Sequence, residues 1–332
     1  MTGAALAQLP VVRQILESGD PSLEYKARLL LLEEPEDSAR LRRLRAAIAD
    51  SDRARSLLAG REPDGTIAGG PYRKWQGPHW TLYTLALIDY PPGDPQLLPL
   101  REQVYDWLLD AAHLEFRQSL LLPGQEDRFR RCASQEGNAI WYSIRLDIDD
   151  ERTRELAQRL QRWQWPDGGW NCDKRPQART SSVIETLIPL RGLSLAASRY
   201  ADPGAARAGQ RAAEFFLKRR LFRRLRDGQP IREDFFRIQF PVQFYDLLFA
   251  LTVMAEIDRL ADPRCAEAPE LLAARQRPDG GFALEACNAE TSDRLRTRGS
   301  RADGGPRGKT RTNPLVSIEA LRVLKEAGRP PG

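Results

Sequence analysis

Apolar positions along the chain follow two helical patterns that alternate. In residues 150–164 the apolar side chains of Leu156, Leu160 and Trp163 recur at helical spacing among polar residues. In residues 247–255 nearly every side chain is apolar. The first pattern is typical of a helix that packs one face on a core, and the second of a helix buried on all sides. The chain is therefore predicted to be all-α, with amphipathic helices covering buried ones.

The same patterns, together with capping signals, place the other helices. Short helices are expected in residues 1–50, including a strongly charged one at 36–49. Outer and inner helices are then expected to alternate: outer at 51–60, 99–113, 150–164, 205–221 and 264–276, and inner at 77–89, 135–146, 181–194, 241–260 and 314–327. Pro189 is expected to bend its inner helix, and Asn313 to cap the last one.

A turn motif recurs between these helices. Pro-Asp-Gly-Gly followed by an aromatic residue stands at 166–170 and again at 278–282, a shorter copy stands at 63–65, and Asp227-Gly228 marks a further junction. Proline ends the preceding helix, and the paired glycines allow positive φ and close backbone approach. A fixed motif with a period of roughly 50–60 residues predicts an array of helical hairpins.

These motifs carry a family resemblance. With the stretches Lys74–Trp80, Cys132–Asn138 and Gly168–Asp173, the repeated turn resembles the repeats of the terpene cyclase and protein prenyltransferase superfamily, and more narrowly single-domain bacterial proteins of the squalene-cyclase-like type. The resemblance covers the chain from about residue 50 onward. It implies an α/α toroid of about five to six helical repeats, with an inner ring around a central cavity and an outer ring.

The domain organisation follows from this reading. Residues 1–50 are expected to form a helical extension packed on the ring, and residues 51–332 the toroid itself. The polar segment 286–312 interrupts the last hairpin and is expected to be either flexible or a lid over the cavity mouth.

Composition excludes several classes of function. The 51 Lys and Arg residues against 46 Asp and Glu give a net charge of +5, which does not indicate a nucleic-acid partner. No apolar run is long enough for a transmembrane helix, and the first ten residues lack the pattern of a signal peptide. The four cysteines are unevenly spaced and form no Cys-x-x-Cys pair, so a cytoplasmic location with reduced thiols is expected.

The acidic segment Asp147-Ile148-Asp149-Asp150 matches the Asp-x-Asp-Asp acid motif of class II terpene cyclases. In those enzymes the motif faces the cavity from the start of an inner helix, whereas here it follows an inner helix and opens an outer one. Aspartates in the first turn of a helix are favoured by capping and by the helix dipole. The segment is therefore predicted to be a helix cap.

A zinc site like that of protein prenyltransferases is the second candidate. Cys172 and Asp173 stand just after a repeated turn, but the chain has only two histidines, His79 and His113, and both precede them. Histidine is the ligand that such a site would lack. No metal or other cofactor is expected, with a site of His79, Cys172 and Asp173 left open as an alternative.

The cavity mouth is expected where loops lead into inner helices. Aromatic side chains suit an apolar cavity, and desolvated carboxylates suit acid–base chemistry. Asp173, Glu185 and Asp246 are the candidate catalytic acids. The candidate substrate-binding residues are Trp75, His79, Trp80, Arg131, Asn138, Trp141, Trp170, Asn171, Cys172, Arg175, Ser182, Phe236 and Tyr245. For each of them, ordinary packing or ion pairing is the alternative.

Three functions remain open from the sequence. The first is an isoprenoid-handling enzyme or binder, a transferase or isomerase if it turns over. The second is a carbohydrate-active enzyme with paired carboxylates, because α/α toroids also carry glycosidases. The third is a noncatalytic scaffold that binds protein or lipid.

Overall fold

A computed structural model of the chain describes residues 2–113, 121–122, 124, 128–241, 245–287, 290–291, 299–300 and 303–329. The protein is mostly helical, as predicted. Its α-helices are α1 Gly3–Leu6, α2 Pro10–Leu16, α3 Pro21–Lys26, α4 Ala39–Ile48, α5 Asp52–Leu58, α6 Pro78–Leu87, α7 Leu98–Leu109, α8 Ser134–Arg145, α9 Glu151–Trp163, α10 Val183–Tyr200, α11 Pro203–Leu217, α12 Leu247–Glu256, α13 Glu267–Ala273 and α14 Pro314–Glu326.

Short elements join these helices. They are the π-helix η1 Ala27–Leu31, the 3-10 helices η2 Pro95–Leu97, η4 Glu233–Phe236 and η5 Pro263–Cys265, and the strands β1 Gln239–Phe240, β2 Ala286–Cys287, β3 Glu290–Thr291 and β4 Gly299–Ser300. Strand β1 pairs in parallel with β2, and β3 with β4.

Each predicted helix has an observed counterpart, and the largest differences are at the end of α10 and the start of α12. Helix α10 runs through Pro189 and continues to Tyr200, because Leu193 and Ala196 are still fully buried by packing. Helix α12 begins only at Leu247, where the Asp246 side chain caps it. Sequence patterns locate helices well and their ends less well.

The two complete copies of the repeated motif form the same turn. The backbone N–H of Trp165 donates to the carbonyl of Gly169 at 2.8 Å, and that of Arg277 donates to Gly281 at 2.9 Å. The Gln164 side chain also donates to a carbonyl of α11 at 2.8 Å, which links the turn to a helix further along the chain. Both copies of the motif thus form a turn of the same hydrogen-bonded geometry.

Each glycine of the pair has its own physical reason. Gly168 and Gly280 have φ values of 100° and 82°, a region that side chains with a Cβ rarely adopt. The second glycine is needed for space: a Cβ on Gly169 would lie 2.3 Å from the Thr186 hydroxyl. The turn is therefore in direct contact with α10, the helix that follows it.

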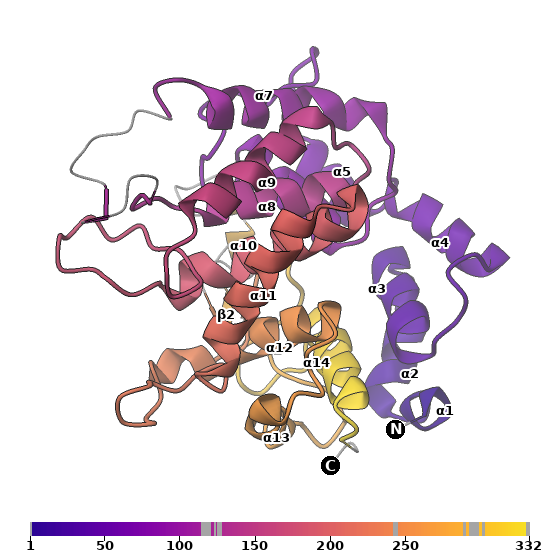
Figure 1. Ribbon diagram of the computed structural model, residues 1–332. Helices are drawn as coiled ribbons and strands as arrows, with labels where there is room; N and C mark the ends of the chain where they lie inside the picture. The colour runs from indigo at the N-terminus through magenta and orange to yellow at the C-terminus, as the bar shows by residue number, and fades with distance from the viewer. Residues whose placement is uncertain are drawn as a thin grey trace.

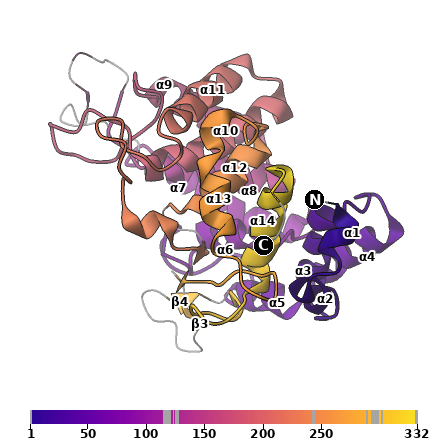
Figure 2. The ribbon, with the colours of Figure 1, turned by 90° about the horizontal axis from the view of Figure 1, so that it is seen from below.

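Helices α6, α8, α10, α12 and α14 contact one another in succession. Helix α7 packs on α6, α9 packs on α8 and α10, α11 packs on α10, and α13 packs on both α12 and α14. Helices α6, α8, α10, α12 and α14 therefore form one layer, and α7, α9, α11 and α13 form a second. Figures 1 and 2 show α14, in yellow, beside the indigo N-terminal helices, and it contacts α2, α3 and η1.

Helices α8 and α10 approach closely because small residues lie at their crossing. A Cβ on Gly192 would lie 2.5 Å from the carbonyl oxygen of Gly137, and a Cβ on Gly137 would lie 2.7 Å from the nitrogen of Pro189. This close crossing brings the N-terminal ends of the two helices together. Within the described ranges, no helix combines the length and apolar character that crossing a membrane requires.

Candidate functional site

A cavity of about 630 Å³ lies among α6, α8, α10, α12 and α14. Its aromatic walls come from Tyr83, Trp141, Phe240 and Phe249, and aliphatic side chains of η1 and α14 add to them. This volume and this aromatic lining are typical of small-molecule sites.

One end of the cavity is lined by paired charges. The Lys26 ammonium lies 3.1 Å from Asp89 and 2.9 Å from Glu319, and Arg145 lies 2.5 Å from Asp89. These residues come from α3, the end of α6, α14 and α8. Lys26 belongs to the N-terminal fifty residues, so that segment supplies part of the cavity wall.

Arg191 crosses the cavity wall between aromatic rings. Its Nε and Nη2 each donate to the Glu256 carboxylate at 2.6 Å, and its guanidinium lies 3.7 Å from the ring centre of Trp141. The Nη1 atom is buried and has no hydrogen-bond partner among the described residues. A buried donor without a partner is costly, so this group favours a ligand that brings an acceptor.

Asp246 is the buried acid of the cavity. Its side chain accepts hydrogen bonds from the backbone N–H of Phe249 at 2.7 Å and of Gln239 at 2.9 Å. Burial raises its pKa to about 7, although these N–H donors oppose the shift. The carboxyl group therefore titrates near neutral pH.

Of the residues predicted for the mouth, Trp141 and Asp246 line this cavity. The others lie elsewhere, because most of the cavity wall comes from the helices themselves, and of the loops that precede these helices only the one before α12 contributes, through residues such as Phe240 and Asp246. The predicted residues that do not line it are Trp75, His79, Trp80, Arg131, Asn138, Trp170, Asn171, Cys172, Asp173, Arg175, Ser182, Glu185, Phe236 and Tyr245. The expected placement of the mouth is thus wrong for most of them.

Several of these residues have packing roles. The Trp170 indole donates to the Leu160 carbonyl at 3.1 Å, and the Tyr245 hydroxyl donates to the Leu221 carbonyl at 2.6 Å. The Trp75 and Trp80 rings pack against each other at a tilt of 51°, with ring centres 4.4 Å apart. Of the rest, Asn138 is buried on α8, Ser182 precedes α10, Arg131 lies over the Trp163 ring and Phe236 packs on Phe222.

His79 lies in an aromatic core rather than in a metal site. Its ring packs against Tyr72, Trp80, Trp107 and Tyr142, and its Nδ1 lies 3.3 Å from the Tyr142 hydroxyl. Burial lowers its pKa to about 3, so the ring is neutral. The alternative site of His79, Cys172 and Asp173 does not assemble among the described residues, because the groups that meet Cys172 are different ones.

Asp173 is not a buried acid. It lies 2.5 Å from Arg175, whose side chain is 81% exposed, and hydrogen bonds from Arg175 lower the pKa of Asp173 to about 2. Asn171 accepts a hydrogen bond from the Asp173 backbone and donates to the Thr180 carbonyl, so both belong to a hydrogen-bonded surface loop. The expectation that Asp173 is a desolvated catalytic group is wrong.

A second polar cluster joins the N-terminal ends of α8 and α10. The Sγ atoms of Cys132 and Cys172 and a carboxylate oxygen of Glu185 all lie within 4.8 Å of one another. The hydrogen bond between the thiols raises the pKa of Cys132 and lowers that of Cys172, and burial raises that of Glu185. Cys132 was not among the predicted site residues, although it, too, directly precedes an inner helix.

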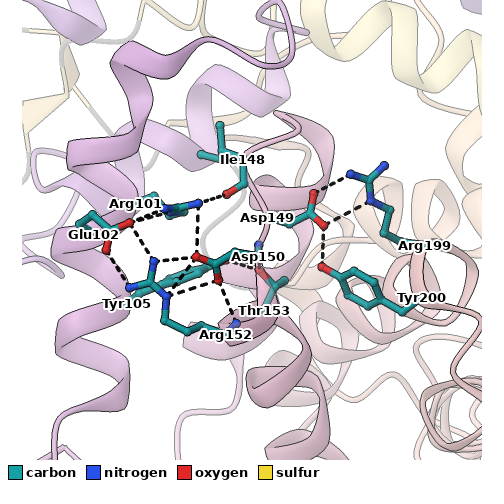
Figure 3. Close-up of polar contacts among 10 residues, drawn as sticks. All are labelled: Arg101, Glu102, Tyr105, Ile148, Asp149, Asp150, Arg152, Thr153, Arg199 and Tyr200. Atoms are coloured by element: carbon teal, nitrogen blue, oxygen red, sulfur yellow. Dashed lines mark hydrogen bonds and ion pairs between the residues drawn. The ribbon is translucent and has the colours of Figure 1, made fainter.

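The acidic segment 147–150 is a cap, as predicted. Figure 3 shows the Asp150 side chain at the start of α9, where it accepts from the Arg152 backbone at 2.9 Å and forms a capping box with Thr153. Arg101 and Arg152 pair with Asp150, and Asp149 accepts from the Tyr200 hydroxyl at 2.7 Å. Helix capping, ion pairs and the hydrogen bond from Tyr200 thus account for the contacts of the three aspartate side chains.

Segment 286–312, expected to be a lid or flexible, lies partly outside the described residues. Its last part is anchored: Arg277 donates to the carbonyls of Lys309 and Thr310, and Asn313 to that of Pro306.

In comparisons with known proteins, no family model matches the chain, and no curated protein matches its sequence.

Proposed function

We propose that the chain is a single-domain α/α toroid that binds a mostly apolar small molecule with one oxygen-bearing end in its central cavity. The order of helix contacts supports the toroid: α6 to α14 follow one another, and α3 returns to the end of α6 through Lys26 and through the Ser22 hydroxyl, which donates to the Ile88 carbonyl at 2.7 Å. In this arrangement residues 1–50 take part in closing the ring.

The cavity itself carries the proposal. Aromatic walls favour an apolar chain, and the unpartnered Arg191 Nη1 favours an oxygen acceptor such as a hydroxyl, carboxylate or phosphate. An isoprenoid has this chemistry and is the class that the family resemblance implies. If the ligand is turned over, Asp246 is the residue that exchanges a proton with it, because its carboxyl titrates near neutral pH. The free cysteines are consistent with a cytoplasmic location.

Ligand titration tests this function. Native mass spectrometry first identifies any co-purified lipid, and tryptophan fluorescence then follows titration with farnesol, farnesyl diphosphate and a maltooligosaccharide. We expect both isoprenoids to quench the fluorescence, because Trp141 lies in the cavity wall. Binding of the sugar alone supports the carbohydrate-active alternative, and binding of no probe supports the scaffold.

Two variants locate the bound molecule. Thr252→Met fills space in the cavity wall and is expected to weaken both isoprenoids. Arg191→Lys keeps the charge but removes Nη1, and is expected to weaken the diphosphate about tenfold and the alcohol less. Arg199→Lys, on an exposed arginine outside the cavity, is the matched control. Unchanged affinity in Thr252→Met would place the ligand elsewhere.

A further inference from the structure

The cluster of Cys132, Cys172 and Glu185 is separate from the proposed ligand cavity, since none of the three lines it. Each residue is placed by a different element: Cys132 precedes α8, Cys172 follows the repeated turn at 166–170, and Glu185 lies in the first turn of α10. The close crossing of α8 and α10 brings them to one point. We propose that these three side chains bind a zinc ion.

The donor atoms already have the spacing of a tetrahedral site. Zinc–sulfur bonds of about 2.3 Å and zinc–oxygen bonds of about 2.0 Å place a sulfur and an oxygen ligand roughly 3.5 Å apart. Cys172 Sγ lies 3.5 Å from Glu185 Oε1. All three donor atoms lie within 4.8 Å of one another, so a cation draws the remaining pairs together by at most about 1.3 Å.

The surroundings hold the ligands in place. The backbone N–H of Ser134 donates to Glu185 Oε2 at 3.0 Å, which leaves Oε1 directed toward Cys172. Such outer hydrogen bonds orient metal ligands. The Cys132 side chain is exposed, so an ion can reach the cluster from solvent.

The charge balance also favours a cation. Glu136 is 1% exposed, and neither of its carboxylate oxygens has a hydrogen-bond partner among the described residues. Its charge acts on Cys132, on Glu185 and on the partly buried Arg131, and His113 Nε2 lies 3.8 Å from one of its oxygens. Two buried carboxylates beside two thiols are unfavourable without a compensating positive charge.

The donor set selects the metal. Thiolates prefer soft or borderline cations, and two sulfurs with one carboxylate suit zinc better than magnesium or calcium. Three protein ligands leave a fourth position for water or a substrate atom, which is the arrangement of catalytic zinc sites.

Metal binding to the reduced full-length chain tests the proposal. After treatment with a chelator, the protein is titrated with Zn²⁺ against a chromophoric competitor and with Co²⁺ in the absorption spectrometer. We expect one ion per chain and a thiolate-to-cobalt band in the near ultraviolet. Cys132→Ser and Cys172→Ser are each expected to weaken Zn²⁺ binding at least 100-fold, and Glu185→Gln at least tenfold.

Two matched controls keep the test specific. Asp173→Asn changes the residue next to Cys172, and Cys287→Ser removes a cysteine outside the cluster; both are expected to retain wild-type affinity. Circular dichroism checks that each variant is folded. Reduced wild-type protein that binds neither ion at micromolar concentration overturns the proposal, as does unchanged affinity in folded Cys172→Ser. A Cys132–Cys172 disulfide whose reduction restores no metal binding assigns the pair to redox chemistry instead.

Discussion

Two aspartates cap helices in this protein, and their surroundings give them opposite acidities. At the start of α9, Asp150 lies between Arg101 and Arg152; burial opposes the shift, but hydrogen bonds from Arg152 outweigh it and hold the pKa of Asp150 below its usual value. At the start of α12, Asp246 is 1% exposed and accepts only backbone N–H groups, and burial raises its pKa to about 7. The same local role thus yields a permanent carboxylate in one place and a titrating acid in the other.

The comparison shows that an acid-rich motif is a poor guide to acid chemistry. The segment 147–150 carries three aspartates, but arginines and a tyrosine compensate them. The single Asp246 has no such partner among the described residues. Desolvation, rather than the number of carboxylates, sets which group can exchange a proton at neutral pH.

The largest expected effect is the change in unfolding free energy with pH that results from titration of Asp246. Its pKa is about 7 in the folded chain against 3.8 unfolded, so the folded state holds the proton more tightly. As pH rises from about 4 to about 7, the wild type should therefore lose up to roughly 4 kcal/mol of unfolding free energy relative to Asp246→Asn. Urea unfolding at a series of pH values measures this difference. Parallel profiles for the two proteins would contradict the buried-acid assignment.

Asp150→Ala is expected to lower the unfolding free energy by roughly 2 kcal/mol at pH 7, because the helix cap and the arginine pairs are lost together. The lowered pKa of Asp150 means that its stabilisation is present above its unfolded pKa and disappears as pH falls through the folded value. The cost of the substitution should therefore shrink in acid, the reverse of the trend at Asp246. Glu151→Ala, on the neighbouring side chain that is 89% exposed, is the control and should change little.

Glu136→Gln extends the comparison to a buried acid that has neither arginine nor N–H donors within hydrogen-bond reach in the described structure. In the metal-free protein we expect this substitution to raise the unfolding free energy by about 1 kcal/mol at pH 7, since it removes a buried charge that has no hydrogen-bond partner in the described structure and that His113 and Arg131 offset only in part. Thermal unfolding with a chelator present checks the sign. A clear destabilisation would show that Glu136 has a partner that offsets its burial.

Arg199→Ala should have the smallest effect. Arg199 pairs with Asp147 and Asp149, but its side chain is 45% exposed and Asp149 keeps the Tyr200 hydroxyl. Exposed ion pairs contribute little, so we expect a loss of about 0.5 kcal/mol in urea unfolding. A loss as large as that of Asp150→Ala would mean that the whole acidic segment acts as one network.

Sequence patterns predicted much of the helical framework because their causes are local. Helical periodicity located α9 and α12, the Pro-Asp-Gly-Gly turns recurred as expected, and Asp150 capped its helix as predicted. Each of these depends on residues that are near one another in the chain.

The candidate sites depend on how distant helices meet, which is why the sequence located them poorly. Cys132 and Glu185 come together only through the crossing at Gly137 and Gly192, and nothing within either stretch specifies that approach. The cavity wall takes Arg191 from the middle of α10 and Lys26 from a segment that was expected to lie outside the ring. The prediction placed the cavity mouth in the loops that precede helices, whereas most of the cavity wall comes from the helices themselves.

The contact between the N-terminal helical segment and α14 bears on how the chain folds during synthesis. The Lys325 ammonium donates to the Leu31 carbonyl at 3.1 Å across 294 positions of sequence. The N-terminal helices leave the ribosome long before α14 is synthesised, so their buried faces wait for a partner that follows 294 positions later. Contacts of such long range form slowly. A nascent chain that stalls before α14 therefore exposes apolar surface for chaperones and proteases to recognise.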